Sequence, residues 1–276
     1  MIKFVESSFC VFGNPIHHTL SPVIHKLFSI QTGIFHEYGS QLVSLNKFND
    51  VIKNFFLNQG KGANITVPFK EQAYLFSDLL TNRARMSRSV NTLKKINDKN
   101  ILGDNTDGIG ILYDLKRIKF LNSQCNNVLL VGAGGAARGI IFSLLSYGCN
   151  VVVINRKIDK VVCLSRDFQS IGSISVFEDK LISKYSFNLI INSTVNVCKN
   201  SNFHKIRLLI NPDVCCYDIN YFKNNEHTSF MSFCINNGAV RVSNGIGMLV
   251  SQAAYSFYLW HGVLPEINSV ISALFK

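Results

Sequence analysis

Two side chains, Lys70 and Asp107, have the types and surroundings expected of a proton-transfer pair. Residues 62–70 are typical of a strand that leads into a helix opening near Pro68, so Lys70 lies in the first helical turn. The helix dipole disfavours a cation there, which suggests proton transfer, although a surface lysine extending from the helix fits equally well. Asp107 precedes a helix expected over 109–118, and it either caps this helix or partners Lys70.

A glycine-rich turn in the middle of the chain predicts a site for phosphate groups. Residues 128–131 are typical of a buried parallel strand, and the turn, 132–137, follows directly. A helix over 138–145 and a second strand over 151–154 complete the pattern. This order of elements is typical of a dinucleotide-binding unit, and a plain turn in an α/β core is the alternative.

The small residues of this turn have distinct physical roles. Gly132 permits the tight turn, Gly134 lets the backbone approach a pyrophosphate, and Ala137 allows helix and strand to pack closely. The free N–H groups and the positive dipole end of the helix then favour phosphate binding.

The residues after the second strand indicate which dinucleotide binds. An NAD site usually has Asp or Glu there, bonded to the ribose 2′-hydroxyl, whereas this chain has Asn155, Arg156 and Lys157, with Lys160 one turn later. Arg156 offers a planar, charged fork to a 2′-phosphate, and the lysines add positive charge. No acidic residue lies between the end of this strand and Asp159, so we predict NADP, with a solvated basic loop as the alternative.

Other polar side chains stand where a ligand could bind. Thr19 and Ser21 precede Pro22, which is typical of a first helical turn, and their hydroxyls can cap the helix and also contact an anion. Tyr221 lies just past the end of an expected strand, at the sheet edge where ligands bind. Gln252 lies on a long, nearly uncharged helix, so its amide needs a partner from protein or ligand.

Length and composition restrict the class of protein. With 276 residues, of which 47% are hydrophobic, the chain is long enough for two folded domains. The formal net charge is +11, but the basic residues are scattered rather than gathered in runs, which argues against nucleic acid. The charge instead favours small anions, such as a phosphorylated cofactor and a carboxylate substrate.

The cysteines and the apolar segments indicate the compartment. None of the eight cysteines forms a C-x-x-C pair, and no His pair has metal spacing, so we expect reduced thiols and no metal site. The N-terminal residues lack the apolar stretch of a secretory signal, and no apolar run is long enough to span a bilayer. We therefore expect a cytoplasmic protein without a membrane partner.

Together, these segments resemble the shikimate dehydrogenase family over nearly the whole chain. The matching segments are 12–16, Ser21-Pro22 with His25, 64–70, 90–93, 103–108, 132–138, Asn155-Arg156, Tyr217-Asp218 with Tyr221, and 247–249 with Gln252. The family reaction is the reversible reduction of 3-dehydroshikimate to shikimate by NADPH, in aromatic amino-acid biosynthesis. The resemblance therefore implies an NADP-dependent oxidoreductase acting on this small substrate.

The resemblance also implies an α/β fold of two domains. A substrate-binding domain over 1–106 and 245–276, to which the C-terminal helices return, contains an inserted Rossmann-type NADP-binding domain over 107–244. A homodimer is left open as the assembly.

The resemblance assigns roles to individual residues. It implies that Lys70 and Asp107 are the catalytic pair. The implied substrate contacts are Thr19, Ser21, Thr66, Lys70, Asn91, Asp107, Tyr221 and Gln252. The implied cofactor contacts are Gly132, Ala133, Gly134, Gly135, Ala136, Asn155, Arg156, Lys157, Lys160, Ile219, Gly245 and Met248.

Three positions depart from the family pattern. Thr19 stands where a serine is usual, Asn244 stands where an aspartate is usual, and residues 192–197 lack the small residues that usually shape the cofactor loop. Because none of these changes removes Lys70 or Asp107, we expect activity.

Three other functions fit parts of the sequence. One is a quinate/shikimate dehydrogenase that uses NAD, and Arg156 argues against it. Another is a non-catalytic dinucleotide-binding module, and the Lys70–Asp107 pair argues against it. The third is a nucleic-acid binder driven by the net charge, which the salt dependence of binding would reveal.

Overall fold

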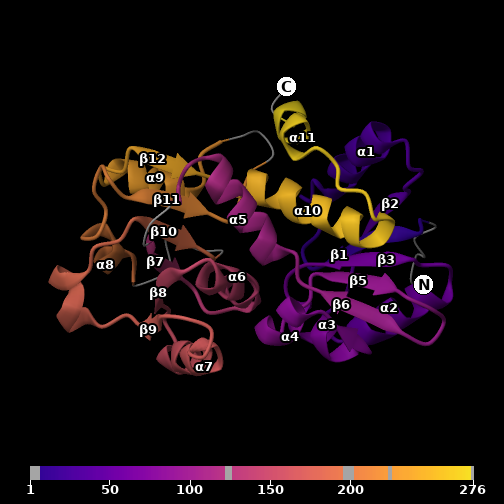
Figure 1. The fold of residues 1–276 in the computed structure, drawn as a ribbon, viewed down its shortest axis with the longest axis horizontal. Helices are drawn as coiled ribbons and strands as arrows, with labels where there is room; N and C mark the ends of the chain where they lie inside the picture. The colour runs from indigo at the N-terminus through magenta and orange to yellow at the C-terminus, as the bar shows by residue number, and fades with distance from the viewer. Residues whose placement is uncertain (1–6, 122–125, 195–201, 223–225, 275–276) are drawn as a thin grey trace. The chain divides into compact units, whose positions relative to one another are not determined.

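The chain divides by its internal contacts into two units (Figure 1). The computed structural model describes residues 7–121, 126–194, 202–222 and 226–274. Unit 1 comprises Met1–Gly110 and Leu249–Lys276, and unit 2 comprises Ile111–Met248. Both boundaries fall inside helices, α5 (Asp107–Arg117) and α10 (Ile246–His261). The domain boundaries expected from the sequence, after residues 106 and 244, lie about one helical turn earlier.

Unit 1 is built on a mixed six-stranded sheet with the order β2-β1-β3-β5-β6-β4. Its strands are β1 (Phe9–Gly13), β2 (Tyr38–Leu42), β3 (Gly62–Ile65), β4 (Leu79–Leu80), β5 (Thr92–Lys95) and β6 (Ile101–Asp104). Its other helices are α1 (Ser21–Thr32), α2 (Phe48–Leu57), α3 (Lys70–Phe76), α4 (Asn82–Ser87) and α11 (Ile267–Ala273). Strand β1 runs parallel to β2 and β3, whereas β5 is antiparallel to both of its neighbours.

Helices cover both faces of this sheet, so β1 and β3 are buried along their whole length. Helix α2 buries residues spaced for a single helical face, including Phe48, Ile52 and Phe55, against the sheet. In Figure 1, α2 and α3 lie on one side of the sheet, and α1 and α10 lie on the other. The rings of Phe28 and Phe257 join α1 to α10, with 5.8 Å between their centroids.

Unit 2 is built on a six-stranded, all-parallel sheet with the order β12-β11-β10-β7-β8-β9. Its strands are β7 (Asn126–Val131), β8 (Cys149–Ile154), β9 (Ile174–Val176), β10 (Leu189–Asn192), β11 (Cys215–Asp218) and β12 (Arg241–Ser243). Its other helices are α6 (Gly135–Ser146), α7 (Ile158–Phe168), the 3₁₀ helix η1 (Asp179–Lys184), α8 (Phe203–Arg207) and α9 (Ser229–Asn236).

The apolar run in β7 is continuous because both faces of the sheet are covered. Val128 and Leu130 point into the core formed with α6 and α7, whereas Leu129 and Val131 point into the core formed with α8 and α9. The strand order is that of a doubly wound dinucleotide-binding sheet. The predicted α/β fold with a Rossmann-type domain is therefore confirmed.

Some element ends differ from the sequence-based expectation. Helix α5 begins at Asp107 rather than at residue 109, and α6 begins at Gly135 rather than at residue 138. The expected cofactor-loop difference at residues 195–197 lies outside the described residues. Within the described part of the chain, no helix is long and apolar enough to cross a membrane.

Candidate active site

Lys70 and Asp107 form an ion pair inside unit 1. Each is the first residue of its helix, α3 and α5, and the Lys70 Nζ atom lies 2.5 Å from Asp107 Oδ2. The two side chains are only 13% and 6% exposed, respectively. An ion pair this shielded from water is screened weakly by salt, so each group helps to hold the other in position.

Amide side chains surround the carboxylate of Asp107. Asn91, which directly precedes β5, places its Nδ2 atom 2.9 Å from Asp107 Oδ1 and 3.2 Å from Gln252 Oε1. Gln252 can come this close because Gly110 has no side chain, since a β-carbon there would lie 2.8 Å from the Gln252 backbone nitrogen. Four of the predicted substrate residues therefore lie in one polar cluster.

Two further predicted residues form a hydroxyl pair at the start of α1. The Thr19 hydroxyl lies 3.1 Å from Ser21 Oγ, and Thr19 Oγ1 accepts the Ser21 backbone N–H at 3.2 Å. Helix α1 begins at Ser21, and its N-cap residue, Leu20, makes no side-chain capping bond, so Thr19 satisfies one of the free N–H groups.

Tyr38 links this hydroxyl pair to the rest of the unit. Its hydroxyl donates to Asn64 Oδ1 at 2.6 Å, and its ring stacks on His25 with 3.9 Å between centroids. Burial raises the pKa of Tyr38 well above its usual value, and a hydrogen bond with Ser21 acts in the opposite direction. Thr66 follows β3, where its backbone N–H donates to the carbonyl of Phe12 at 2.9 Å.

In unit 2, the strand register aligns the residues predicted to contact the cofactor. Val131 is paired with Ile154 on one side and with Asn192 on the other, and Asn192 is paired with Asp218. The residues that follow these strands therefore emerge along one edge of the sheet, among them Gly132, Asn155 and Ile219. Ligands of open α/β sheets bind at this carboxyl edge.

The turn after β7 has the geometry that its glycines predict. Gly132 has a φ of +113°, and a β-carbon there would lie 2.5 Å from Ser193 Oγ, so another residue would be both strained and crowded. A β-carbon at Gly134 would meet no heavy atom of the described residues within 4 Å. Ala133 is half-buried, and Gly135 and Ala136 open helix α6 with their N–H groups at its start. This arrangement fits a pyrophosphate.

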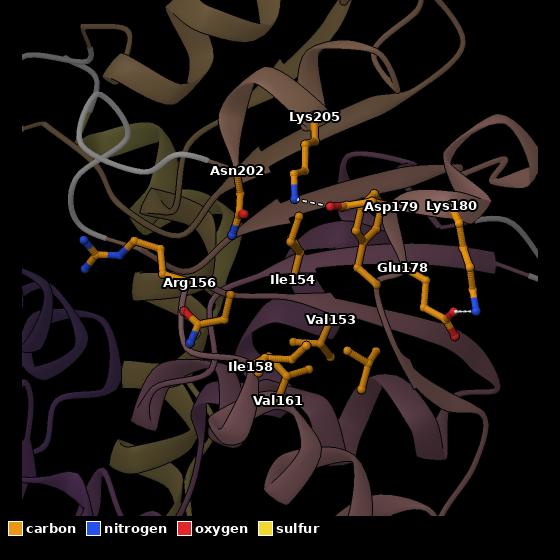
Figure 2. A pocket seen from close by; sticks show the side chains of 13 residues that line it. Val153, Ile154, Arg156, Ile158, Val161, Glu178, Asp179, Lys180, Asn202 and Lys205 are labelled. Atoms are coloured by element: carbon orange, nitrogen blue, oxygen red, sulfur yellow. Dashed lines mark hydrogen bonds and ion pairs between the residues drawn. The ribbon is translucent and has the colours of Figure 1, made fainter.

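A cavity of about 500 Å³ lies beside the end of β8 (Figure 2). Asn155, Arg156 and Ile158 line one part of it, and Glu178, Asp179 and Lys205 line another. In Figure 2 the Arg156 guanidinium extends away from two ion pairs, Lys205–Asp179 at 2.7 Å and Lys180–Glu178 at 2.9 Å. Glu178 and Asp179 are therefore each paired with a lysine. Arg156, Lys157 and Lys160 are exposed.

The remaining predicted cofactor residues also meet within unit 2. Gly245 lies directly against the carbonyl of Ile219, and its N–H donates to the Asn220 carbonyl at 3.1 Å. Met248 is buried in the core of which Ile219 forms the margin. Tyr221, predicted to contact substrate, is half-buried and follows β11.

Several residues in these clusters were not predicted from the sequence. They are Tyr38, Asn64, Thr92, Thr106 and Ser256 in unit 1, and Phe177, Glu178, Asp179, Asn202 and Lys205 around the cavity of unit 2. Asn64 and Thr106 lie within segments already notable in the sequence, whereas Ser256 has no local signal.

The parallel sheet with its glycine turn, together with the lysine–aspartate pair, defines a dinucleotide-dependent oxidoreductase of two α/β domains. Comparison with known sequence families agrees. The pattern "Shikimate dehydrogenase substrate binding domain" matches residues 11–93, "Shikimate / quinate 5-dehydrogenase" matches 114–200, and "Shikimate 5'-dehydrogenase C-terminal domain" matches 245–275. The chain belongs to the shikimate dehydrogenase family.

Individual relatives support the same conclusion. The chain is 64% identical to shikimate dehydrogenase (NADP(+)) of Buchnera aphidicola subsp. Baizongia pistaciae, over 99% of this chain and 98% of that protein. The solved structure of shikimate dehydrogenase from Aquifex aeolicus superposes with a TM-score of 0.83 at 28% identity, over 97% of both chains. Shikimate 5-dehydrogenase from Thermus thermophilus in complex with shikimate gives 0.81 at 26% identity, over 96% of both chains.

Proposed function

We propose that this chain catalyses the reversible, NADP-linked interconversion of 3-dehydroshikimate and shikimate. The observation that carries the proposal is the Lys70–Asp107 pair, in which Nζ lies 2.5 Å from Oδ2 while Asn91 binds the other carboxylate oxygen. An ammonium group held in this way can stabilise negative charge that develops on a substrate oxygen and can supply a proton. A module that only bound a dinucleotide would not need such a pair.

Each side chain of this cluster has a task in the reaction. A nicotinamide cofactor bound by unit 2 would supply the hydride chemistry at the carbon that bears the reacting oxygen. During reduction Lys70 stabilises that oxygen as its negative charge grows and donates a proton to it. Asp107 holds Lys70 in place and accepts a hydrogen bond from a substrate hydroxyl, and Asn91 and Gln252 offer amide groups to further hydroxyls.

We assign the substrate carboxylate to the hydroxyl pair of Thr19 and Ser21. Their oxygens lie 3.1 Å apart at the start of the twelve-residue helix α1, where free N–H groups favour an anion. Thr66 is a further proposed contact in unit 1. Tyr221, in unit 2, is proposed as another hydroxyl contact of the substrate.

The residues of unit 2 fit NADP. The turn at Gly132 and Gly134 suits the pyrophosphate, and Arg156, beside the cavity at the end of β8, suits the 2′-phosphate. The other proposed cofactor contacts are Ala133, Gly135, Ala136, Asn155, Lys157, Lys160, Ile219, Gly245 and Met248. On this proposal unit 1 binds the substrate and unit 2 binds the cofactor.

The compartment and the assembly are also proposals. The described cysteines, such as the fully buried Cys10 and Cys216, are all free thiols, which supports a reducing compartment such as the cytoplasm. Unit 1 exposes large apolar side chains, including Ile30 and Phe35, which supports a homodimer. Light scattering on the purified chain measures the assembly directly.

An absorbance assay at about 340 nm, where reduced nicotinamide absorbs, tests the function. The purified chain is given shikimate or quinate, each with NADP or NAD. We expect rapid reduction of NADP with shikimate and much slower reaction in the other three combinations. Absence of any reaction with shikimate refutes the proposed activity, and a preference for NAD refutes the assignment of the cofactor.

A further inference from the structure

Two buried hydroxyl groups, those of Thr92 and Ser256, lie behind the polar cluster at Asp107. Thr92 begins β5 and Ser256 lies on α10, one turn beyond Gln252. Both residues are fully buried, and their hydroxyl oxygens are 2.8 Å apart. Burying a pair of polar groups costs folding free energy unless their hydrogen bonds are made. The hydrogen bonds of this pair therefore indicate why the two hydroxyls are there.

The Asn91 side chain has a single orientation that satisfies its neighbours. The backbone N–H of Thr106 can only donate, and it lies 2.8 Å from Asn91 Oδ1, so the amide oxygen must face it. The Thr92 hydroxyl lies 2.9 Å from the same oxygen. The Asn91 Nδ2 group is thereby turned towards Asp107 Oδ1, at 2.9 Å.

The same reasoning gives the direction of the bonds between the hydroxyls. Thr92 has one hydroxyl hydrogen, and when it is donated to Asn91 Oδ1 its oxygen must accept from elsewhere. Three donors are within reach, namely Ser256 Oγ at 2.8 Å, Asn64 Nδ2 at 3.1 Å and Thr106 Oγ1 at 3.4 Å.

Asn64 and Ser256 complete this series of hydrogen bonds. Asn64 Nδ2 faces the carbonyl oxygen of Asn91 at 3.2 Å, which fixes it as a donor, and it also lies 3.0 Å from Ser256 Oγ. The Ser256 hydroxyl has acceptors in Thr92 Oγ1 at 2.8 Å, in the Gln252 carbonyl at 3.1 Å and in Thr106 Oγ1 at 3.2 Å, and Thr92 is the nearest. When Ser256 donates to Thr92, its nearest acceptor, hydrogen bonds run in one direction, from Asn64 through Ser256 and Thr92 to Asn91.

We propose that Thr92 and Ser256 are positioning residues for the reaction at Lys70 and Asp107. By holding Asn91 Oδ1, they keep Asn91 Nδ2 on one oxygen of Asp107, which leaves the other oxygen aimed at Lys70. Neither hydroxyl contacts the substrate. This inference rests on the proposed function, because its measurable consequence is in the rate of that reaction.

The test removes one hydroxyl at a time and measures steady-state kinetics with shikimate and NADP. Thr92→Val keeps the side-chain shape, and we expect a decrease in kcat of about tenfold to a hundredfold from the lost orientation. Thr92→Ser restores the hydroxyl and should recover most of kcat. Ser256→Ala should lower kcat by only about two- to fivefold, because Asn64 still donates to Thr92. The KM for NADP should remain near the wild-type value in all three variants.

A matched control separates positioning from loss of stability. Ser87 is fully buried in unit 1, and its hydroxyl donates to the backbone carbonyls of Ala84 and Ser89 rather than to a side chain of the cluster. Ser87→Ala should lower the thermal midpoint without changing kcat.

The outcomes distinguish this inference from the proposed function. A wild-type chain that does not oxidise shikimate refutes the proposed function. An active wild type with unchanged kcat in Thr92→Val, or with equal losses in Thr92→Val and Thr92→Ser, overturns the positioning role. If Thr92→Val does not fold, the test rests on Ser256→Ala. A kcat of Ser256→Ala equal to the kcat of Ser87→Ala then overturns the positioning role.

Discussion

His36 and His25 share a hydrogen bond in the interior of unit 1, with 3.0 Å between His36 Nε2 and His25 Nδ1. His261 extends the row, since its Nε2 lies 2.9 Å from His36 Nδ1. A neutral imidazole has one donor and one acceptor nitrogen, so a row of neutral rings satisfies both of these bonds. Burial lowers the pKa of all three rings, that of His36 to about 3, and repulsion from neighbouring imidazoles or lysines adds to the effect.

We predict that the chain loses stability as the pH falls below about 6.5. Imidazoles of the unfolded chain titrate near 6.5, whereas those of the folded row titrate lower, so between these values the unfolded state binds more protons and acid favours unfolding. Each ring contributes a slope of up to about 1.4 kcal/mol per pH unit. Urea unfolding at several pH values between about 7.5 and 5.5 measures this dependence of stability on pH. His36→Gln should flatten the slope, whereas His18→Gln, in an exposed loop, should not. A stability that is independent of pH in this window contradicts the prediction.

Arg156→Ala should raise the KM for NADP far more than the KM for NAD. The variant loses a charge-assisted bond to the 2′-phosphate, worth about 1.5–3 kcal/mol. Kinetics with both cofactors measure the difference. The control is Arg166→Ala, which removes an exposed arginine of helix α7 that does not line the cavity. Equal effects of Arg156→Ala on both cofactors refute the assignment.

Ser21→Ala and Tyr221→Phe should each weaken shikimate binding by about 1–3 kcal/mol, because each removes one hydroxyl proposed to contact the substrate. The affinity for NADP should remain nearly unchanged. Calorimetric titration with each ligand separates the two effects. A loss of NADP affinity instead would move these residues out of the substrate site.

Lys70→Ala should lower kcat by about 10²–10⁴-fold, which is the usual cost of losing a positioned acid–base group. Asp107→Asn keeps the shape, removes the charge, and should also lower kcat more than it raises KM. The double variant should be little worse than the worse single variant, because the two residues act as one unit. Steady-state kinetics on folded, NADP-binding variants measure these effects. A near-normal kcat in Lys70→Ala would remove Lys70 from the mechanism.

The sequence by itself determined the dinucleotide-binding fold of unit 2. Residues 128–131 are uniformly apolar because helices cover both faces of the sheet, and Gly132 occupies the one turn position with a φ of +113°. These signals are local, since burial and backbone conformation act on each residue where it stands. The prediction of NADP rather than NAD likewise depended on one short segment around Arg156.

Only the tertiary structure decided how the polar residues of unit 1 meet. Asn91 and Gln252 are 161 residues apart in sequence and 3.2 Å apart in space, and Ser256 lies 2.8 Å from Thr92 through a buried hydroxyl that no local pattern distinguishes. The row of His25, His36 and His261 was likewise not predicted. Periodicity reports which face of an element is buried, but the partner of a buried polar group depends on how sheet and helices pack, and that packing brings together residues from opposite ends of the chain.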